Sequence, residues 1–191
     1  MGWTFPYSTT SRDQVVDYLL REYGDPGLCE IIDHSRRGNV LYAVFHHHPK
    51  DYRFIVVFLL QGPSPRARRQ GDRTWGYKDM DESMGPCYYG CPERLLRQSD
   101  VHDEQAVAWR EACRQQRVTN ARLRHLSRQL QAGQILQVAA GWDANGQRMK
   151  PVEFVRSYSP TFFIGKDEAG KLWRYRWSSV VITSDQKKEV A

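Results

Sequence analysis

The sequence predicts an α+β fold in which an N-terminal helix lies on a small antiparallel sheet, a helical middle follows, and an SH3-like β-barrel ends the chain. Three observations support this prediction. A segment with helical periodicity precedes three β-rich runs, a long segment between residues 100 and 130 repeats its apolar residues with helical spacing, and five short β-rich runs fill residues 134–183.

The first 61 residues provide the elements of the predicted sheet layer. Residues 2–7 are typical of a short strand, and Ser11 followed by Gln14 resembles a capping box that opens a helix. The apolar face of that helix holds Val15, Val16, Leu19, Leu20 and Tyr23, and the helix is expected to end at Gly24. Residues 28–33, 39–47 and 53–61 then predict a three-stranded antiparallel meander.

The middle of the chain is predicted to be helical. Residues 62–74 are rich in proline and arginine and indicate a polar loop, and Pro92 begins a short helix through Arg97. Asp100 is the expected N-cap of a long helix that runs to Leu130. The apolar stripe of this helix holds Ala108, Trp109, Ala112, Leu123, Leu126 and Leu130.

Short strands are predicted after Gly133, at residues 134–140, 152–157, 161–165, 172–177 and 180–183. Five such strands in about fifty residues are typical of a small SH3-like barrel. The predicted domains are therefore residues 1–131 and 132–184, followed by a tail at 185–191.

Composition limits the class of protein. The chain of 191 residues is 40% hydrophobic and carries a formal net charge of +6, and its longest apolar run, residues 54–60, is far shorter than the roughly 20 residues that span a bilayer. Four cysteines without a secretory signal predict a reducing cytoplasmic location. No membrane partner and no cofactor are expected, and the oligomeric state is left open.

Five arginines are predicted to line the face of the long helix opposite its apolar stripe: Arg110, Arg114, Arg117, Arg124 and Arg128. Since Glu111 is the only acidic residue between residues 105 and 130, their mutual repulsion calls for an anionic partner. The guanidinium fork suits phosphates, so a nucleic-acid backbone is the sharper hypothesis. An acidic protein surface or a plainly solvated face are the alternatives.

A second basic group lies in the predicted barrel. Lys171, Arg174 and Arg176 alternate with aromatic residues, and this interleaving is typical of nucleic-acid-binding surfaces. Strand alternation places Trp173, Tyr175 and Trp177 on one face. We expect these three rings to lie in the core of the barrel, with an exposed stacking platform as the alternative.

The segment from Trp75 to Pro92 carries the densest chemistry of the chain. Its candidate catalytic or ligand-binding residues are Tyr77, Lys78, Asp79, Asp81, Glu82, Ser83 and Tyr88. Three carboxylates beside a lysine are sufficient for acid-base work, but adjacent acids in one turn are commonly structural. The histidines at 46–48 are expected at a solvated strand end, and Cys87 and Cys91 are expected to be buried or incidental thiols. No metal site is therefore predicted.

The run WGYKDMDESMGP, followed by Tyr88-Tyr89 and Cys91-Pro92, together with the opening Met-Gly-Trp, resembles an uncharacterised protein family of phages, plasmids and integrative elements. The resemblance implies a setting on mobile DNA and no particular activity. We therefore expect a non-enzymatic accessory protein of mobile genetic elements that binds nucleic acid or a nucleoprotein complex, with counter-defence as one purpose. The alternatives are an enzyme or small-ligand binder that uses the Trp75–Cys91 segment, and a protein-docking module.

Overall fold

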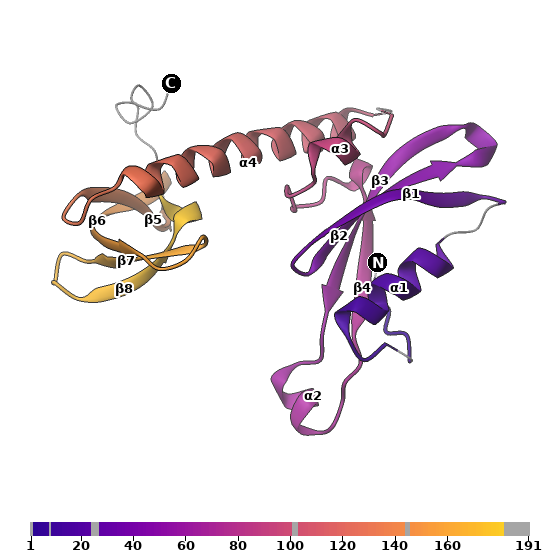
Figure 1. Ribbon diagram of the computed structural model, residues 1–191, viewed down its shortest axis with the longest axis horizontal. Coiled ribbons are helices and arrows are strands. Elements are labelled where there is room, and N and C mark those ends of the chain that lie inside the picture. The colour runs from indigo at the N-terminus through magenta and orange to yellow at the C-terminus, as the bar shows by residue number, and fades with distance from the viewer. Residues whose placement is uncertain (1, 8, 24–26, 101–102, 144–145, 182–191) are drawn as a thin grey trace. The chain divides into compact units, whose positions relative to one another are not determined.

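Figure 1 shows the computed structural model, which describes residues 2–7, 9–23, 27–100, 103–143 and 146–181. The chain divides into two compact units, Met1–Gln116 and Arg117–Ala191. Each unit contains one four-stranded antiparallel sheet, so the α+β class with a helical middle is confirmed. Among the described residues, no helix is long and apolar enough to cross a membrane.

The sheet of the first unit contains the predicted meander and a fourth strand. Its strands follow one another in chain order across the sheet: β1 (Cys29–Arg37), β2 (Val40–His47), β3 (Tyr52–Gln61) and β4 (Gly76–Asp81). The fourth strand was not predicted, because the acidic residues of the Trp75–Cys91 segment hide its alternation. The predicted strand at residues 2–7 is reduced to a single bridge between Thr4 and Tyr77.

Both faces of this sheet are covered, which explains why β2 and β3 are nearly continuous apolar runs. One face packs against α1 (Arg12–Glu22) through Val15 and Leu19. The other face packs against α3 (Glu93–Leu96) and the first half of α4 through Leu95 and Trp109. The sheet is therefore the centre of the first unit.

The predicted start of the first helix is confirmed. The side chain of Ser11 accepts a hydrogen bond from the backbone N–H of Gln14, as an N-cap residue does. The side chain of Gln14 accepts in return from the backbone N–H of Thr10. The predicted end at Gly24 lies outside the described residues.

Between β3 and β4 the predicted loop contains a short helix, α2 (Pro65–Arg69). Ser64 caps it by accepting from the N–H of Ala67, and Pro65 stands in its first turn. The loop is therefore partly ordered by its own capping residues.

The long helix α4 (Glu104–Gln129) is unbroken, but its predicted cap is wrong. Asp100 accepts a hydrogen bond from the N–H of Arg53 instead, whereas Asp103 accepts from the N–H of Ala106 at the start of α4. Ala108 was predicted to be on the apolar stripe and is exposed. The prediction assumed one stripe along the whole helix, but its two halves contribute to different hydrophobic cores.

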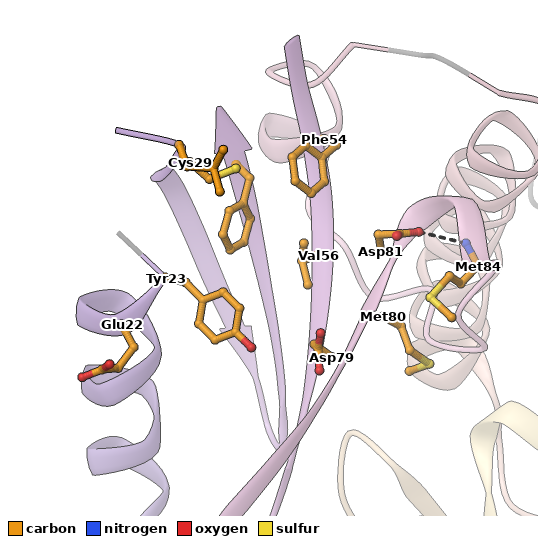
Figure 2. A pocket seen from close by; sticks show the side chains of 11 residues that line it. Glu22, Tyr23, Cys29, Phe54, Val56, Asp79, Met80, Asp81 and Met84 are labelled. Atoms are coloured by element: carbon orange, nitrogen blue, oxygen red, sulfur yellow. Dashed lines mark hydrogen bonds between the residues drawn. The ribbon is translucent and has the colours of Figure 1, made fainter. Parts of the chain in front are cut away.

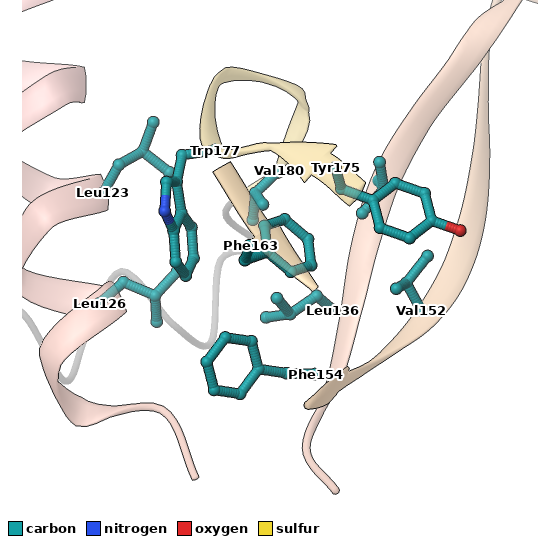
Figure 3. Packing of buried hydrophobic residues seen from close by; sticks show 10 residues of the cluster. Leu123, Leu126, Leu136, Val152, Phe154, Phe163, Tyr175, Trp177 and Val180 are labelled. Carbon is teal, nitrogen blue, oxygen red and sulfur yellow. The ribbon is translucent and has the colours of Figure 1, made fainter. Parts of the chain in front are cut away.

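The sheet of the second unit has the order β5 (Ile135–Asp143), β6 (Gly146–Ser157), β7 (Phe162–Lys166) and β8 (Leu172–Arg176). Its inner face packs against Leu123 and Leu126 of α4, and Phe163 and Trp177 lie at the centre of that core (Figure 3). A single bridge between Val138 and Val180 follows the short helix η3 (Trp177–Ser179). Within the described residues the strands do not form a closed barrel.

Gly165 lies where the inner face of β7 approaches its neighbours most closely. A Cβ atom there would lie 2.3 Å from Cγ1 of Val152 and 3.1 Å from the ring of Phe163. We therefore expect Gly165→Ala to lower the free energy of unfolding by about 1 to 3 kcal/mol, because the core is overpacked. Urea denaturation measures this loss, and Gly2→Ala, where nothing lies within 4 Å, is the control that should change nothing. Equal stability of the two variants would contradict the predicted close contact.

Candidate nucleic-acid interface

The positive charge of the protein belongs to the second unit. Residues 117–191 contain 13 lysines and arginines against six acidic residues, a formal charge of +7. Residues 1–116 contain 15 against 16, a formal charge of −1. Any surface that attracts a polyanion is therefore to be sought in the second unit.

The predicted arginine stripe on α4 is not continuous. Arg110 was predicted to face water, but only 2% of its surface is exposed, and it pairs with Glu82 in the interior of the first unit. Arg114 is exposed and lies 3.6 Å from a carboxylate oxygen of Glu93 and 3.8 Å from one of Glu111. These two arginines are thus already matched by acidic residues of their own unit.

The remaining helix arginines belong to the second unit. Arg124 and Arg128 are exposed, and Arg117 is half-buried. Nε of Arg124 donates to the backbone oxygen of Asn120 at 3.3 Å. In the described part of the chain neither Arg124 nor Arg128 forms an ion pair with an acidic residue. The predicted stripe therefore keeps basic side chains in its second half.

Three exposed arginines gather on the outer face of the second sheet. Across the strands, Arg156 of β6 pairs with Ile164 of β7, and Ile164 pairs with Arg174 of β8. Arg176 lies two residues further along β8 and pairs with Phe162. Since side chains of directly paired residues share a face, the three guanidinium groups belong to one surface.

Aromatic rings lie among these guanidinium groups. Arg174 lies over the ring of Phe162 at 4.7 Å and near that of Tyr158 at 6.0 Å. Arg176 lies 5.7 Å from the Phe162 ring, and Arg156 lies 5.9 Å from the Tyr158 ring. These distances are within the range of cation–π contacts. We name these five residues the basic face.

Ion pairs do not neutralise the basic face. Within the described ranges, none of Arg156, Arg174 and Arg176 forms an ion pair with an acidic residue. Glu153, an acidic residue on the same strand as Arg156, forms its ion pair with Lys166 instead, at 3.5 Å. Tyr158 is 54% exposed. The surface thus combines unneutralised guanidinium groups with accessible aromatic carbon, which is the combination that binds unpaired nucleotides.

Sequence reasoning found Arg174 and Arg176 of the basic face but missed Arg156. Strict alternation would place Arg156 on the inner face together with Phe154, which is buried. A bulge between these two residues shifts the register and turns Arg156 outward. The available signal was the charge of Arg156, because strict alternation would place this arginine on the same face as the buried Val152 and Phe154.

Lys171 and Trp173 lie at the start of the predicted interleaved run. Tyr175 and Trp177 are buried in the core, as strand alternation predicted, whereas Trp173 is 46% exposed. Its indole N–H donates to Asp167 at 2.7 Å, and Nζ of Lys171 lies 4.3 Å from its ring. Hydrogen bonds from the backbone N–H of Lys171 and from Trp173 lower the pKa of Asp167, so the carboxylate that orients this ring is ionised.

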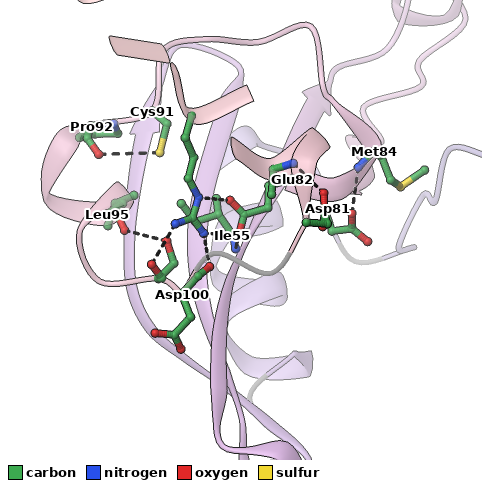
Figure 4. A network of polar contacts seen from close by, with 12 residues as sticks. Ile55, Asp81, Glu82, Met84, Cys91, Pro92, Leu95 and Asp100 are labelled. Atoms are coloured by element: carbon green, nitrogen blue, oxygen red, sulfur yellow. Dashed lines mark hydrogen bonds and ion pairs between the residues drawn. The ribbon is translucent and has the colours of Figure 1, made fainter. Parts of the chain in front are cut away.

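The three carboxylates of the Trp75–Cys91 segment have separate structural roles. Glu82 is 3% exposed, and its carboxylate accepts from Arg110 and from the backbone N–H of Ile55 (Figure 4). Asp81 caps the short helix η2 (Glu82–Met84) by accepting from the N–H of Met84. Asp79 extends from β4 toward a cavity on the face covered by α1.

That cavity has a volume of about 400 Å³ and is mostly apolar. Asp79 and Asp81 are the only members of the predicted site that line it, beside Tyr23, Phe54 and Met84 (Figure 2). Ser83 and Glu82 line a different cavity of about 360 Å³, together with Asp81. The predicted pocket residues are therefore divided between two cavities.

The other three predicted residues lie outside both cavities. Tyr77 is buried in the core of the first unit, where its hydroxyl lies 3.4 Å from that of Tyr23. Lys78 is half-buried on the opposite face of β4 from Asp79, and Tyr88 is 40% exposed. The structure thus gathers no single catalytic constellation from the seven predicted residues.

The end of this segment is packed against the sheet. The hydroxyl of Tyr42 accepts a hydrogen bond from the backbone N–H of Gly90, and Cys91 is fully buried beside it. Burial raises the pKa of Tyr42 to about 12, so its hydroxyl stays protonated. A Cβ at position 90 would lie 2.9 Å from that hydroxyl, which explains the glycine.

No family model, no curated protein and no solved structure matches the chain.

Proposed function

We propose that the protein binds single-stranded nucleic acid through the basic face of its second unit. The observation that supports this proposal is the exposed cluster of Arg156, Arg174 and Arg176 around Tyr158 and Phe162, without acidic partners among the described residues. Guanidinium groups bind phosphate oxygens in a fork, and aromatic rings stack on bases.

A single strand fits this surface better than a duplex does. The rings of Tyr158 and Phe162 can contact bases only where those bases are unpaired, and the base–aromatic contact is tolerant of sequence. The expected mode of binding is therefore phosphate contact plus stacking.

Other basic side chains of the second unit are proposed to raise the local concentration of the polyanion. Arg117, Arg124 and Arg128 of α4 and Lys171 beside Trp173 add to the formal charge of +7. Charge of one sign in this amount accelerates association with a polyanion in low salt. A role as an accessory protein of mobile genetic elements, with counter-defence as one purpose, is compatible with this activity and stays a proposal.

We also propose that the second unit is an SH3-like barrel in its topology. The bridge between Val138 and Val180, together with the hydrogen bond from Val181 N–H to the oxygen of Gln137, brings the end of the described chain back to β5. A short helix, η3, precedes this return. The predicted fifth strand, residues 180–183, lies partly outside the described residues, and closure through Val180 and Val181 would leave the basic face on the outside of the barrel.

Fluorescence anisotropy with short labelled oligonucleotides across a salt series tests the proposed function. We expect log K to fall linearly with log salt, with a slope of about −0.7 for each phosphate contact on a single strand. Single strands should bind more tightly than duplexes of the same sequence, and comparison of DNA with RNA identifies the preferred sugar. Binding that does not respond to salt, or equal affinity for a duplex, would overturn the proposal.

A further inference from the structure

Two histidines and a glutamate converge at one end of the first sheet. Glu30 of β1 pairs directly with His46 of β2, and His48 begins η1 (His48–Lys50) two residues later. Oε1 of Glu30 lies 3.8 Å from Nδ1 of His46 and 3.9 Å from Nε2 of His48. The ligand atoms of all three residues lie within 4.8 Å of one another.

The imidazole of His46 is oriented by Asp51. Nε2 of His46 lies 2.9 Å from Oδ1 of Asp51, and because a carboxylate only accepts, Nε2 must be the donor. In the neutral imidazole the lone pair is then on Nδ1, the nitrogen that faces Glu30. A carboxylate that fixes the tautomer of a histidine in this way is a recurrent outer partner of metal ligands.

His48 supplies a second nitrogen without a hydrogen-bond partner. Its Nε2 atom is buried and accepts or donates no hydrogen bond within the described residues, although it points to the same carboxylate. The rings of His46 and His48 are 4.6 Å apart and meet edge to face. A buried imidazole nitrogen without a partner is unfavourable unless an ion or a water molecule occupies the space before it.

We propose that Glu30, His46 and His48 bind a divalent transition-metal ion, Zn²⁺ in the first place, and that Asp51 is a positioning residue for His46. Two imidazole nitrogens and one carboxylate oxygen suit Zn²⁺, whereas Ca²⁺ and Mg²⁺ prefer oxygen ligands alone. Bonds of about 2.0 to 2.2 Å to Zn²⁺ place neighbouring ligand atoms about 3.3 to 3.6 Å apart, so movements of a few tenths of an ångström close the two glutamate distances. Three protein ligands leave a coordination position for water or a substrate.

Strand alternation lets at most two of the three histidines share a side, and a solvated strand end was favoured over a metal site, because the pairing of Glu30 with His46 across β1 and β2 leaves no local pattern. The strand ends at His47, whose Nδ1 instead accepts from the N–H of Lys50 and caps η1. That short helix brings His48 back toward Glu30. Three consecutive histidines therefore have different environments, and His46 and His48 form the pair.

Isothermal titration of the chelator-treated, tag-free chain with ZnCl₂ tests the proposal. We expect one Zn²⁺ per chain, and tetrahedral Co²⁺ absorption bands when Co²⁺ replaces it. Asp51→Gly should weaken binding about 10- to 100-fold, because it removes the outer partner of His46 while glycine accepts the positive φ of 46° at this position. His48→Ala and Glu30→Gln remove or neutralise a ligand and should weaken binding further.

His34→Ala is the matched control, since His34 is an exposed histidine of β1 outside the cluster. Its Zn²⁺ affinity should equal that of the unaltered chain, and circular dichroism verifies that every variant is folded. Failure of the unaltered chain to bind Zn²⁺ would overturn the proposal. Binding that survives both His48→Ala and Glu30→Gln would overturn it equally, because the ion would then occupy another site.

Discussion

Glu82→Ala should lower the free energy of unfolding by about 3 to 5 kcal/mol, because it leaves the guanidinium of Arg110 buried without its counter-ion. Both side chains are at most 3% exposed, and two hydrogen bonds of 2.6 Å join them in a fork. Arg110 also donates to the backbone oxygens of Ser99 and Asp100. The pair therefore ties η2, α4 and the segment after α3 together, and urea denaturation measures the effect of its loss.

The same helix provides a matched control for this prediction. Arg114 lies one turn after Arg110, but its ion pairs are solvent-exposed, so Arg114→Ala should cost less than about 1 kcal/mol. The double variant Glu82→Leu, Arg110→Met should lose less than the sum of the two single losses, because it leaves no unpaired charge. A loss in Glu82→Ala no larger than that in Arg114→Ala would contradict the structural role of the pair.

The buried pair also shows where sequence reasoning about α4 failed. Helical spacing placed Arg110 and Arg114 together on the side expected to face water, but it could not show that Arg110 is buried against the first unit. A single acidic residue within the helix suggested unneutralised arginines, yet the partner of Arg110 is Glu82, 28 residues earlier. Long-range pairing of this kind leaves no local pattern.

Local patterns predicted most of the fold well. The three strands of the meander, the Ser11 cap, the unbroken α4 and the buried Tyr175 and Trp177 follow from periodicity and capping, which depend on neighbouring residues. The strand β4 was missed because Lys78, Asp79 and Asp81 are edge-strand residues with mixed polarity. Edge position is set by tertiary pairing and not by the segment itself.

The candidate interface was predicted only in part for a related reason. Arg174 and Arg176 follow simple alternation with buried Tyr175 and Trp177, so they could be placed on the outer face. Arg156 could not, because the bulge before it is a property of the pairing with β7. Phe162 and Tyr158 become part of the basic face only through contacts across strands.

Reversal of charge on the basic face should abolish most of the proposed nucleic-acid affinity. Arg174→Glu, Arg176→Glu removes two phosphate contacts and adds two repulsive charges beside the Phe162 ring, so we expect a loss of more than about tenfold and a smaller salt slope, by about 0.7 per lost contact. Both side chains are exposed, so the fold should be little affected. Anisotropy titrations with one labelled single strand measure affinity and slope together.

A control with the same change in net charge separates a defined interface from general attraction. Arg66 and Arg69 of α2 are exposed in the first unit, and Arg66→Glu, Arg69→Glu alters the total charge by the same amount. If the basic face is the binding surface, this control should retain most of the affinity. Tyr158→Ala removes a stacking ring but no charge, so it should lower the binding free energy by about 1 to 3 kcal/mol without changing the salt slope. Equal losses in the two charge-reversal variants would show that net charge alone attracts the strand, because long-range attraction does not depend on where the charges lie.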